Sequence, residues 1–440
     1  MSQDPRTIID DNPMSMIQII AVAITIGLNA LDGFDILSIA FASPGIVADW
    51  GIQPRAIGIV LSMELLGMGI GAITLGGLAD KIGRRHTILI CLGLMVVGMG
   101  MASTANSILE LSIWRVITGL GIGGMLAATN ATVAEFANKR RRTLCISLMA
   151  IGYPIGATAG GAIIAGLLVN NDWRIVFEFG AIVTACFIPL VWFFVPESPA
   201  FLTDKQPKGA LESINRTFKR MGFTSINSLP QLTETEKAYS VSDIFSPALL
   251  AKTVLITIAY FTHLATFYFI LKWAPVIVGE MGFAPSSAAG VLVWANIGGA
   301  IGGGLLGLIA LKYSIRKLTI GGMLISVPMI IIFGSGFTEL GTLSIAAASA
   351  GFFTNAGVVG LYALIATSFP THVRATATGF VIGVGRGGAF LSPIIAGFMF
   401  EAGLGLQAVA VFMASGALIG AISLIILGYK TYRGAVPVTG

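Results

Sequence analysis

The chain has 440 residues, of which 55% are hydrophobic and only 11% are charged. Soluble domains carry about 25% charged residues, so this composition excludes a water-exposed globular protein. The 26 Lys and Arg against 21 Asp and Glu leave a formal net charge of +5, too small for a nucleic-acid-binding surface. The three cysteines lie far apart in apolar stretches, so we expect no disulfide, metal or other cofactor. The composition predicts a polytopic membrane protein.

Stretches without Asp, Glu, Lys or Arg recur along the whole chain, and most of them reach the ~20 residues that a spanning helix needs. Two further spans emerge if each holds one internal charge, Glu64 in one and Arg386 in the other. We therefore predict an all-α membrane protein with twelve spanning helices, at residues 16–41, 55–78, 87–105, 108–134, 143–168, 175–195, 249–271, 285–310, 318–336, 341–368, 375–400 and 403–428.

The basic residues predict the orientation. If the N-terminus is cytoplasmic, 21 of the 26 Lys and Arg residues fall in inner segments. Only Arg55, Arg174 and Lys272 fall in outer segments, and Arg115 and Arg386 fall within the bilayer. By the positive-inside rule both termini face the cytoplasm.

The longest polar stretch, residues 203–243, separates the sixth span from the seventh. Its charge pattern predicts a short amphipathic helix around residues 208–220, in a linker that lies on the inner membrane surface. We expect a first six-helix bundle over 1–198, a cytoplasmic central loop over 199–247 and a second six-helix bundle over 248–440.

The two halves resemble each other at an offset of 232 residues. A parallel repeat of two six-helix bundles is the layout of one large class of transporters, whose substrate site lies near the membrane midplane. The offset superposes Arg84-Arg85 on Arg316-Lys317, Arg142 on Arg374, Gly156 on Gly388, and Glu64 on Asn296.

Four motifs resemble those of a known family. Residues 76–85 read GGLADKIGRR and resemble the GxLaDrxGRR signature of the major facilitator superfamily. Residues 114–123, WRVITGLGIG, resemble its RxxxGxGxG, and PESP at 196–199 resembles a marker of its sugar, organic-ion and aromatic-acid branches. DGFD at 32–35 resembles the DGxD of the aromatic acid:proton symporter family, whose members carry benzoate-type acids. The resemblance covers nearly the whole chain and implies the major facilitator fold.

The first motif lies in the short loop after the second span. Gly83 suits a tight turn, Asp80 is placed to cap the next helix, and Glu135 is a plausible partner for Arg84. We expect a cytoplasmic gate here, although basic residues that only fix topology remain an alternative. The predicted gate residues are Gly76, Asp80, Gly83, Arg84, Arg85 and Glu135.

Ionisable side chains at membrane depth are costly and usually mark a transport pathway. Asp32 and Asp35 lie three residues apart and share one face of the first span. Two carboxylates this close in a poorly hydrated site disfavour double ionisation, so one of them suits a proton carrier. A structural Asp–Arg pair remains open. The predicted proton-coupling residues are Asp32, Asp35, Glu64 and Arg115.

Arg386 lies about eleven residues into its span, or ~17 Å at the helical rise, near the midplane. Its glycine neighbours, Gly385, Gly387 and Gly388, leave room for an anion, and a guanidinium holds a carboxylate through two hydrogen bonds. Aromatic and polar residues at matching depths are expected to contact an aromatic ring and its hydroxyl groups. The predicted substrate-binding residues are Arg386, Tyr260, His263, Phe267, Trp294, Asn296, Asn355 and Tyr362.

The sequence favours a secondary active transporter that takes up an aromatic carboxylate, such as a hydroxybenzoate, together with protons by alternating access. A proton symporter of a non-aromatic organic acid or a sugar-like solute, and an uncoupled channel or membrane sensor, remain alternatives. We find no nucleophile–base pair and no nucleotide-binding loop, so we expect no enzymatic activity. The expected partners are the substrate, protons and the lipid bilayer, in a monomer of the bacterial inner (plasma) membrane. The substituents of the ring, the proton stoichiometry and the oligomeric state stay open.

Overall fold

The computed structural model describes residues 4–230 and 241–433. Over these residues it contains fifteen α-helices and one short 3-10 helix, and twelve of the α-helices are long and apolar enough to cross a membrane. The first six candidate spans are α2 (Met16–Trp50), α3 (Pro54–Ile82), α4 (Arg84–Ser103), α5 (Ile108–Phe136), α6 (Arg142–Leu167) and α7 (Ile175–Phe194). The other six are α10 (Leu250–Glu280), α11 (Pro285–Ile309), α12 (Ile315–Phe333), α13 (Leu340–Ser368), α14 (Thr371–Glu401) and α15 (Leu406–Arg433). The short elements are α1 (Pro5–Asp11), α8 (Pro199–Lys205), α9 (Ala210–Met221) and η1 (Val241–Phe245).

The twelve spans predicted from the sequence are confirmed, but several helices are longer than their apolar runs. The largest differences are in α2, which continues from the predicted 41 to Trp50, and in α10, which continues from 271 to Glu280. Lys272, expected in a loop, is therefore a helical residue, and its side chain is completely buried. In α10 the predicted span stops before the charge of Lys272, whereas the helix continues because its backbone hydrogen bonds do not depend on the side chain.

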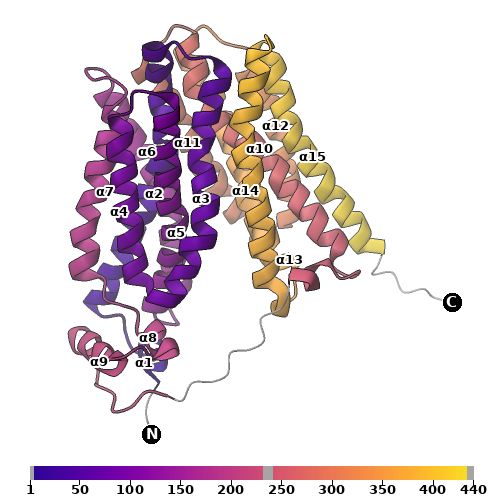
Figure 1. Ribbon diagram of the computed structural model, residues 1–440. Helices are drawn as coiled ribbons and strands as arrows, with labels where there is room; N and C mark the ends of the chain where they lie inside the picture. The colour runs from indigo at the N-terminus through magenta and orange to yellow at the C-terminus, as the bar shows by residue number, and fades with distance from the viewer. Residues whose placement is uncertain (1–3, 231–240, 434–440) are drawn as a thin grey trace, which may run out of the picture. The chain divides into compact units, whose positions relative to one another are not determined.

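The described residues fall into two compact units. Unit 1 comprises Met1–Ser38, Met63–Gly160 and Arg174–Thr235, and unit 2 comprises Ile39–Ser62, Gly161–Trp173 and Glu236–Gly440. Unit 2 thus includes the C-terminal part of α2, the start of α3 and the α6–α7 connection as well as α10 to α15 (Figure 1). Residues 231–240, part of the predicted central loop, and 434–440 lie outside the described residues. The division at 1–198 and 248–440 stays a prediction.

A pair of repeat-related glycines makes the same kind of contact in each half. A Cβ atom on Gly156 of α6 would overlap the carbonyl oxygen of Ala30 in α2. A Cβ atom on Gly388 of α14 would likewise overlap the carbonyl oxygen of Phe261 in α10. Small residues let membrane helices approach until their backbones touch. The repeat seen in the sequence therefore includes a close helix crossing in each half.

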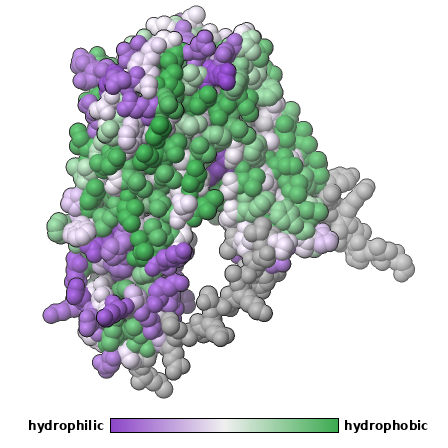
Figure 2. Space-filling view, in the orientation of Figure 1, coloured by the Kyte–Doolittle hydropathy of each residue, from purple (hydrophilic) through white to green (hydrophobic). Residues whose placement is uncertain are grey.

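The amphipathic helix predicted around residues 208–220 is α9, and its apolar face is buried in protein. Ile214, Phe218 and Met221 are buried in a cluster with residues of α1, α8 and the adjoining ends of α5 and α6. Hydrophilic residues gather over this part of unit 1, below the apolar surface of its spans (Figure 2). The helix buries its apolar stripe in protein, and the position of the linker on the inner membrane surface stays a prediction.

Ion pairs fix α1 to this cluster. Arg6 pairs with Asp4 at 2.6 Å and with Asp204 of α8 at 2.7 Å. Asp10 pairs with Arg142 at the start of α6, at 2.5 Å. The side-chain hydrogen bond from Arg6 holds the pKa of Asp4 below its usual value.

Candidate functional site

The four predicted proton-coupling residues lie together inside unit 1. Asp32 and Asp35 come from α2, Glu64 from α3 and Arg115 from α5, and all four side chains are buried. Arg115 forms an ion pair with Glu64. One of its Nη groups donates to the backbone carbonyl of Asp35 at 3.0 Å. Residues from three separate helices are thus joined by one guanidinium.

Two residues from other helices complete the surroundings of Arg115. The Sδ atom of Met99 in α4 accepts a hydrogen bond from its other Nη group at 2.9 Å. The ring of Phe177 in α7 lies with its centroid 5.3 Å from the guanidinium carbon. Soft sulfur and an aromatic face are weak partners for a cation compared with a carboxylate. Glu64 therefore supplies the main charge compensation for Arg115.

The carboxyl groups of Asp32 and Asp35 have a different environment. All four of their oxygens are buried, and none accepts a hydrogen bond within the part of the chain that the structure describes. The cluster holds three acids and one fixed cation, so full ionisation would leave two uncompensated charges out of water. Burial of a carboxyl group in this position costs much less free energy when the group is protonated. The arrangement can therefore take up and release protons.

In unit 2, Tyr260 of α10 and Tyr362 of α13 form a pair. Their hydroxyl oxygens are 3.0 Å apart in a hydrogen bond, and their ring centroids are 5.7 Å apart with the rings inclined at 64°. Arg386 of α14 lies within electrostatic range of Tyr260, and so does Tyr268, which sequence reasoning did not select. Tyr260 is buried, whereas Tyr362 is exposed and Arg386 is half-buried. An aromatic, hydroxyl-bearing surface with one cation results.

The glycines around Arg386 do not leave space for an anion, which corrects the expectation from the sequence. A Cβ atom on Gly385 would overlap the ring of Tyr260. Gly388 is in contact with the backbone of Phe261, and Gly387 faces the ring of the same residue. These glycines allow α14 to pack on α10.

Three other predicted substrate residues are used in packing between or along helices. His263 is fully buried, and its Nε2 lies 2.8 Å from the carbonyl oxygen of Thr354. Asn355 donates to the carbonyl of Gly299 at 2.7 Å, and Asn296 donates to that of Leu292 at 2.9 Å. The sequence pattern could not identify these backbone carbonyls, each of which contacts one nitrogen of its side chain. The other ring nitrogen of His263, Nδ1, is buried without a partner among the described residues.

The remaining two predicted substrate residues are more open. Trp294 of α11 is 52% exposed, and Phe267 of α10 is half-buried against the ring of Tyr268. Over the described residues, neither of them forms a hydrogen bond or a cation–π contact with Arg386. Of the eight predicted residues, Tyr260, Tyr362 and Arg386 are the ones between which the structure shows an interaction.

The α3–α4 turn brings most of the predicted gate residues together within unit 1. Arg84 binds Glu135 of α5 through Nε and Nη2, with the shortest contact at 2.8 Å. It also lies 3.0 Å from Asp80, which belongs to the last turn of α3. A Cβ atom on Gly76 would lie 3.3 Å from the Cβ atom of Ala127 in α5, so the glycine allows the two helices to approach closely. The side chain of Arg85 turns elsewhere and donates to the carbonyl of Trp192 at the end of α7.

The residue that sequence reasoning missed is Glu197. Asp80 was expected to cap α4, but Glu197 does so: its Oε1 accepts from the backbone N–H of Arg84 at 2.8 Å, and its Oε2 from that of Arg85 at 3.2 Å. Gly83, at the N-cap, has φ of +102°, and a Cβ atom there would overlap this carboxylate. A carboxylate at a helix N-terminus satisfies unpaired N–H groups and the helix dipole. The residue before Arg84 is a glycine and not Ser, Thr or Asp, which was the signal that a more distant side chain must cap α4.

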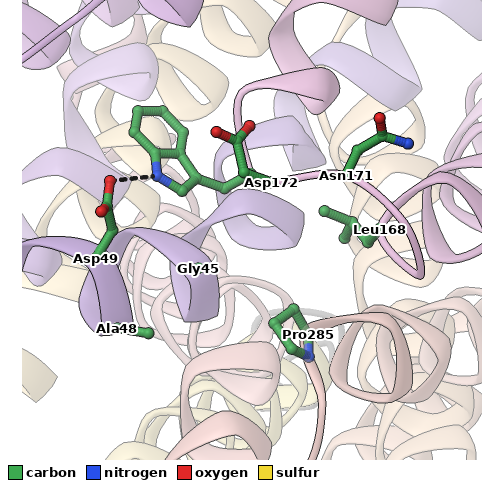
Figure 3. A pocket seen from close by; sticks show the side chains of 8 residues that line it. Gly45, Ala48, Asp49, Leu168, Asn171, Asp172 and Pro285 are labelled. Atoms are coloured by element: carbon green, nitrogen blue, oxygen red, sulfur yellow. Dashed lines mark hydrogen bonds between the residues drawn. The ribbon is translucent and has the colours of Figure 1, made fainter.

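Unit 2 also contains a surface pocket of about 330 Å³, where the end of α2 meets the α6–α7 connection and the start of α11 (Figure 3). Asp49 accepts a hydrogen bond from the ring N–H of Trp173 at 3.1 Å, and Asp172 and Asn171 lie beside them. None of the predicted substrate-binding residues lines this pocket.

Comparison with known proteins gives a consistent result. Residues 24–337 match the family model described as Major Facilitator Superfamily. A gallate transporter of Pseudomonas putida is 27% identical over 99% of this chain and 97% of its own length. A 3-(3-hydroxy-phenyl)propionate transporter of Escherichia coli is 30% identical over 93% and 95%, and the 4-hydroxybenzoate transporter PcaK of Acinetobacter baylyi is 28% identical over 88% and 86%.

Solved structures show the same fold. The xylose transporter XylE from E. coli, in a partially occluded inward open conformation, has a TM-score of 0.72 at 15% identity and covers 97% of this chain and 99% of its own. A mutant of the nucleoside transporter NupG has a TM-score of 0.73 at 13% identity and covers 93% and 99%.

Proposed function

The chain belongs to the Major Facilitator Superfamily, and on this premise we propose that it carries an aromatic carboxylate across a membrane together with protons. As a member of this superfamily it is an integral, multi-pass membrane transporter and not an enzyme. The observation that carries proton coupling is the group of three buried carboxyls around one guanidinium in unit 1. The substrate class is supported by the similar proteins that transport gallate, a hydroxyphenylpropionate and 4-hydroxybenzoate.

In the proposed cycle, Asp32 and Asp35 carry the protons. Glu64 stays paired with Arg115 and keeps the guanidinium in place, because breaking a buried pair is strongly unfavourable. Asp32 has no hydrogen-bond donor within the described residues, so nothing but a proton compensates its charge. A protonated Asp32 makes the cluster less charged, which lowers the cost of moving it between the two access states.

Arg386 is the proposed anchor for the substrate carboxylate. It forms no hydrogen bond or ion pair with any described residue, and a half-buried guanidinium inside a span favours an anionic partner. Tyr260 and Tyr362 then offer ring faces and hydroxyl groups to an aromatic acid. In His263, Asn296 and Asn355 one side-chain nitrogen is engaged with a backbone carbonyl, so we assign these residues to the support of this surface rather than to contact with the substrate.

The α3–α4 turn, with Arg84, Glu135 and Glu197, is proposed as the cytoplasmic gate. Its ion pairs lie inside unit 1, so the turn can act as one rigid piece during the access change. The distribution of basic residues supports the proposal that both termini face the cytoplasm. The bacterial sources of the similar transporters support a location in the inner membrane, and we propose a monomer as the simplest arrangement.

The test is uptake by the purified full-length protein in liposomes. With an inwardly directed proton gradient, labelled 4-hydroxybenzoate or gallate should accumulate, and a protonophore should abolish the accumulation. Asp32→Asn should reduce uphill accumulation by about tenfold or more, because the neutral amide resembles the protonated carboxyl but cannot release a proton. The variant should retain exchange of internal for external substrate.

A matched control removes an exposed acid. Asp11→Asn alters a carboxylate outside the spans and should accumulate substrate normally. Accumulation by Asp32→Asn equal to that of Asp11→Asn would disprove the proton role. Accumulation of cyclohexanecarboxylate or xylose in preference to aromatic acids would favour the non-aromatic alternatives, and uptake independent of the gradient would favour a channel.

A further inference from the structure

The C-terminal end of α7 exposes three aromatic residues in a row. Trp192 is 55% exposed, Phe193 64% and Phe194 45%. They occupy the last positions of a span that ends at Phe194. Aromatic residues at the ends of spans mark the level of the lipid headgroups, where their rings contact acyl chains and polar groups together.

Two arginines from other elements bind the last turn of this helix. Arg85 of α4 donates from Nη2 to the carbonyl of Trp192 at 2.6 Å, and its guanidinium lies 5.0 Å from the centroid of the Trp192 ring. Arg220 of α9 donates from Nη2 to the next carbonyl, that of Phe193, at 3.1 Å. Figure 1 shows α9 below this end of α7. Two cations therefore lie side by side at the edge of the aromatic surface.

Neither cation is neutralised. Arg85 and Arg220 form no ion pair with any residue that the structure describes, unlike the adjacent Arg84. The Nε of Arg85 is buried and has no acceptor in the same part of the chain. Each guanidinium has five N–H donors, and a helix C-terminus offers only partial negative charge. The exposed Arg216 and Lys219 of α9 add to the positive charge beside them.

We propose that this surface, formed by Arg85, Arg220, Trp192 and Phe193, binds the headgroup of an anionic phospholipid. The phosphodiester accepts hydrogen bonds from the two guanidinium groups, and the first segments of the acyl chains lie along the exposed rings. A small water-soluble anion would leave the aromatic surface uncovered, so the lipid is the occupant that matches both the charge and the apolar area. All four residues of this site belong to unit 1, and none of them is a proposed substrate-binding or proton-coupling residue.

The test is lipid binding to the purified full-length protein in detergent, measured by native mass spectrometry during titration with phosphatidylglycerol or phosphatidylcholine. Phosphatidylglycerol should bind more tightly. In the double variant Arg85→Gln/Arg220→Gln its affinity should fall about tenfold or more, which corresponds to two cations near an anionic headgroup. The control Arg140→Gln/Arg141→Gln removes two exposed cations from the α5–α6 turn and should bind like the native protein.

The single variant Arg220→Gln alters an exposed side chain, keeps the core intact, and should lose part of the affinity. Equal losses in the two double variants would overturn the site, since only total charge would then matter. Equal affinity for phosphatidylcholine would overturn the requirement for an anion. Full competition by soluble glycerophosphoglycerol at lipid concentrations would show that the acyl chains contribute nothing, which would overturn the lipid assignment.

Discussion

Arg115 in α5 and Arg386 in α14 are both arginines inside spans, but their surroundings differ in every respect. Arg115 is completely buried, is paired with Glu64 and bonds the backbone of Asp35. Arg386 is half-buried and has no hydrogen bond or ion pair among residues 4–230 and 241–433. The difference agrees with our proposal that Arg386 binds the substrate carboxylate, whereas Arg115 is held by groups of the protein itself.

Exchange of each arginine for leucine separates these roles and should give the largest effect. Arg115→Leu removes the ion-pair partner of the buried Glu64, so it should lower the free energy of unfolding by about 3 to 5 kcal/mol. Arg386→Leu should leave the melting temperature nearly unchanged. It should weaken binding of an aromatic acid by one to several orders of magnitude, because a charge-assisted pair with the substrate is lost. Thermal unfolding in detergent and calorimetric titration measure the two quantities.

The double variant Arg115→Leu/Glu64→Leu should recover part of the lost stability, because the unpaired acid is removed with its partner. If Arg386→Leu instead unfolds the protein and Arg115→Leu does not, the assignment of the two arginines is reversed.

The two repeat-related turns offer a second comparison, in which we expect an intermediate effect on stability. At the start of α4, Glu197 accepts the backbone N–H groups of Arg84 and Arg85. At the start of α12, Ser314 makes no side-chain capping bond. Glu197→Ala should therefore destabilise by about 1 kcal/mol, in the range of a lost helix cap, and Ser314→Ala by close to zero. Paired thermal melts of both variants decide this, and equal shifts would show that the cap contributes nothing.

The smallest expected effect concerns the docked N-terminal helix, which has no repeat counterpart among the described residues. The pKa of Asp4 is lowered mainly by the side-chain hydrogen bond from Arg6. The stabilisation is therefore fully present above the ordinary Asp pKa of ~4, and is lost as the pH falls through the lowered value. Amide exchange of residues 5–11, corrected for its intrinsic rate, should be the same at pH 7 and pH 5. It should rise about threefold near pH 3.

In Asp4→Asn the exchange should be raised at every pH, and its further change on acidification should be smaller than in the native protein. A rise already at pH 5 would mean that another group controls the docking.

The sequence predicted those parts of the molecule that depend on local pattern. Twelve spans follow from apolar run length, and the group of Asp32, Glu64 and Arg115 follows from the rarity of charges at depth. Contacts between side chains and distant backbone groups could not be predicted from the sequence. Glu197 bonds an N–H group 113 residues away, and the partner of His263 is the carbonyl of Thr354. Every residue has such groups, so no side-chain pattern marks which of them become partners.

The docking of α1 has a consequence for how the chain is made. Arg6 is synthesised before its partner Asp204, which follows 198 residues later in the chain. At translation rates of ~5–20 residues per second, α1 waits roughly 10 to 40 seconds before α8 exists. The six spans between them are synthesised in that interval, so the contact between α1 and α8 forms only after α2 to α7 have been made.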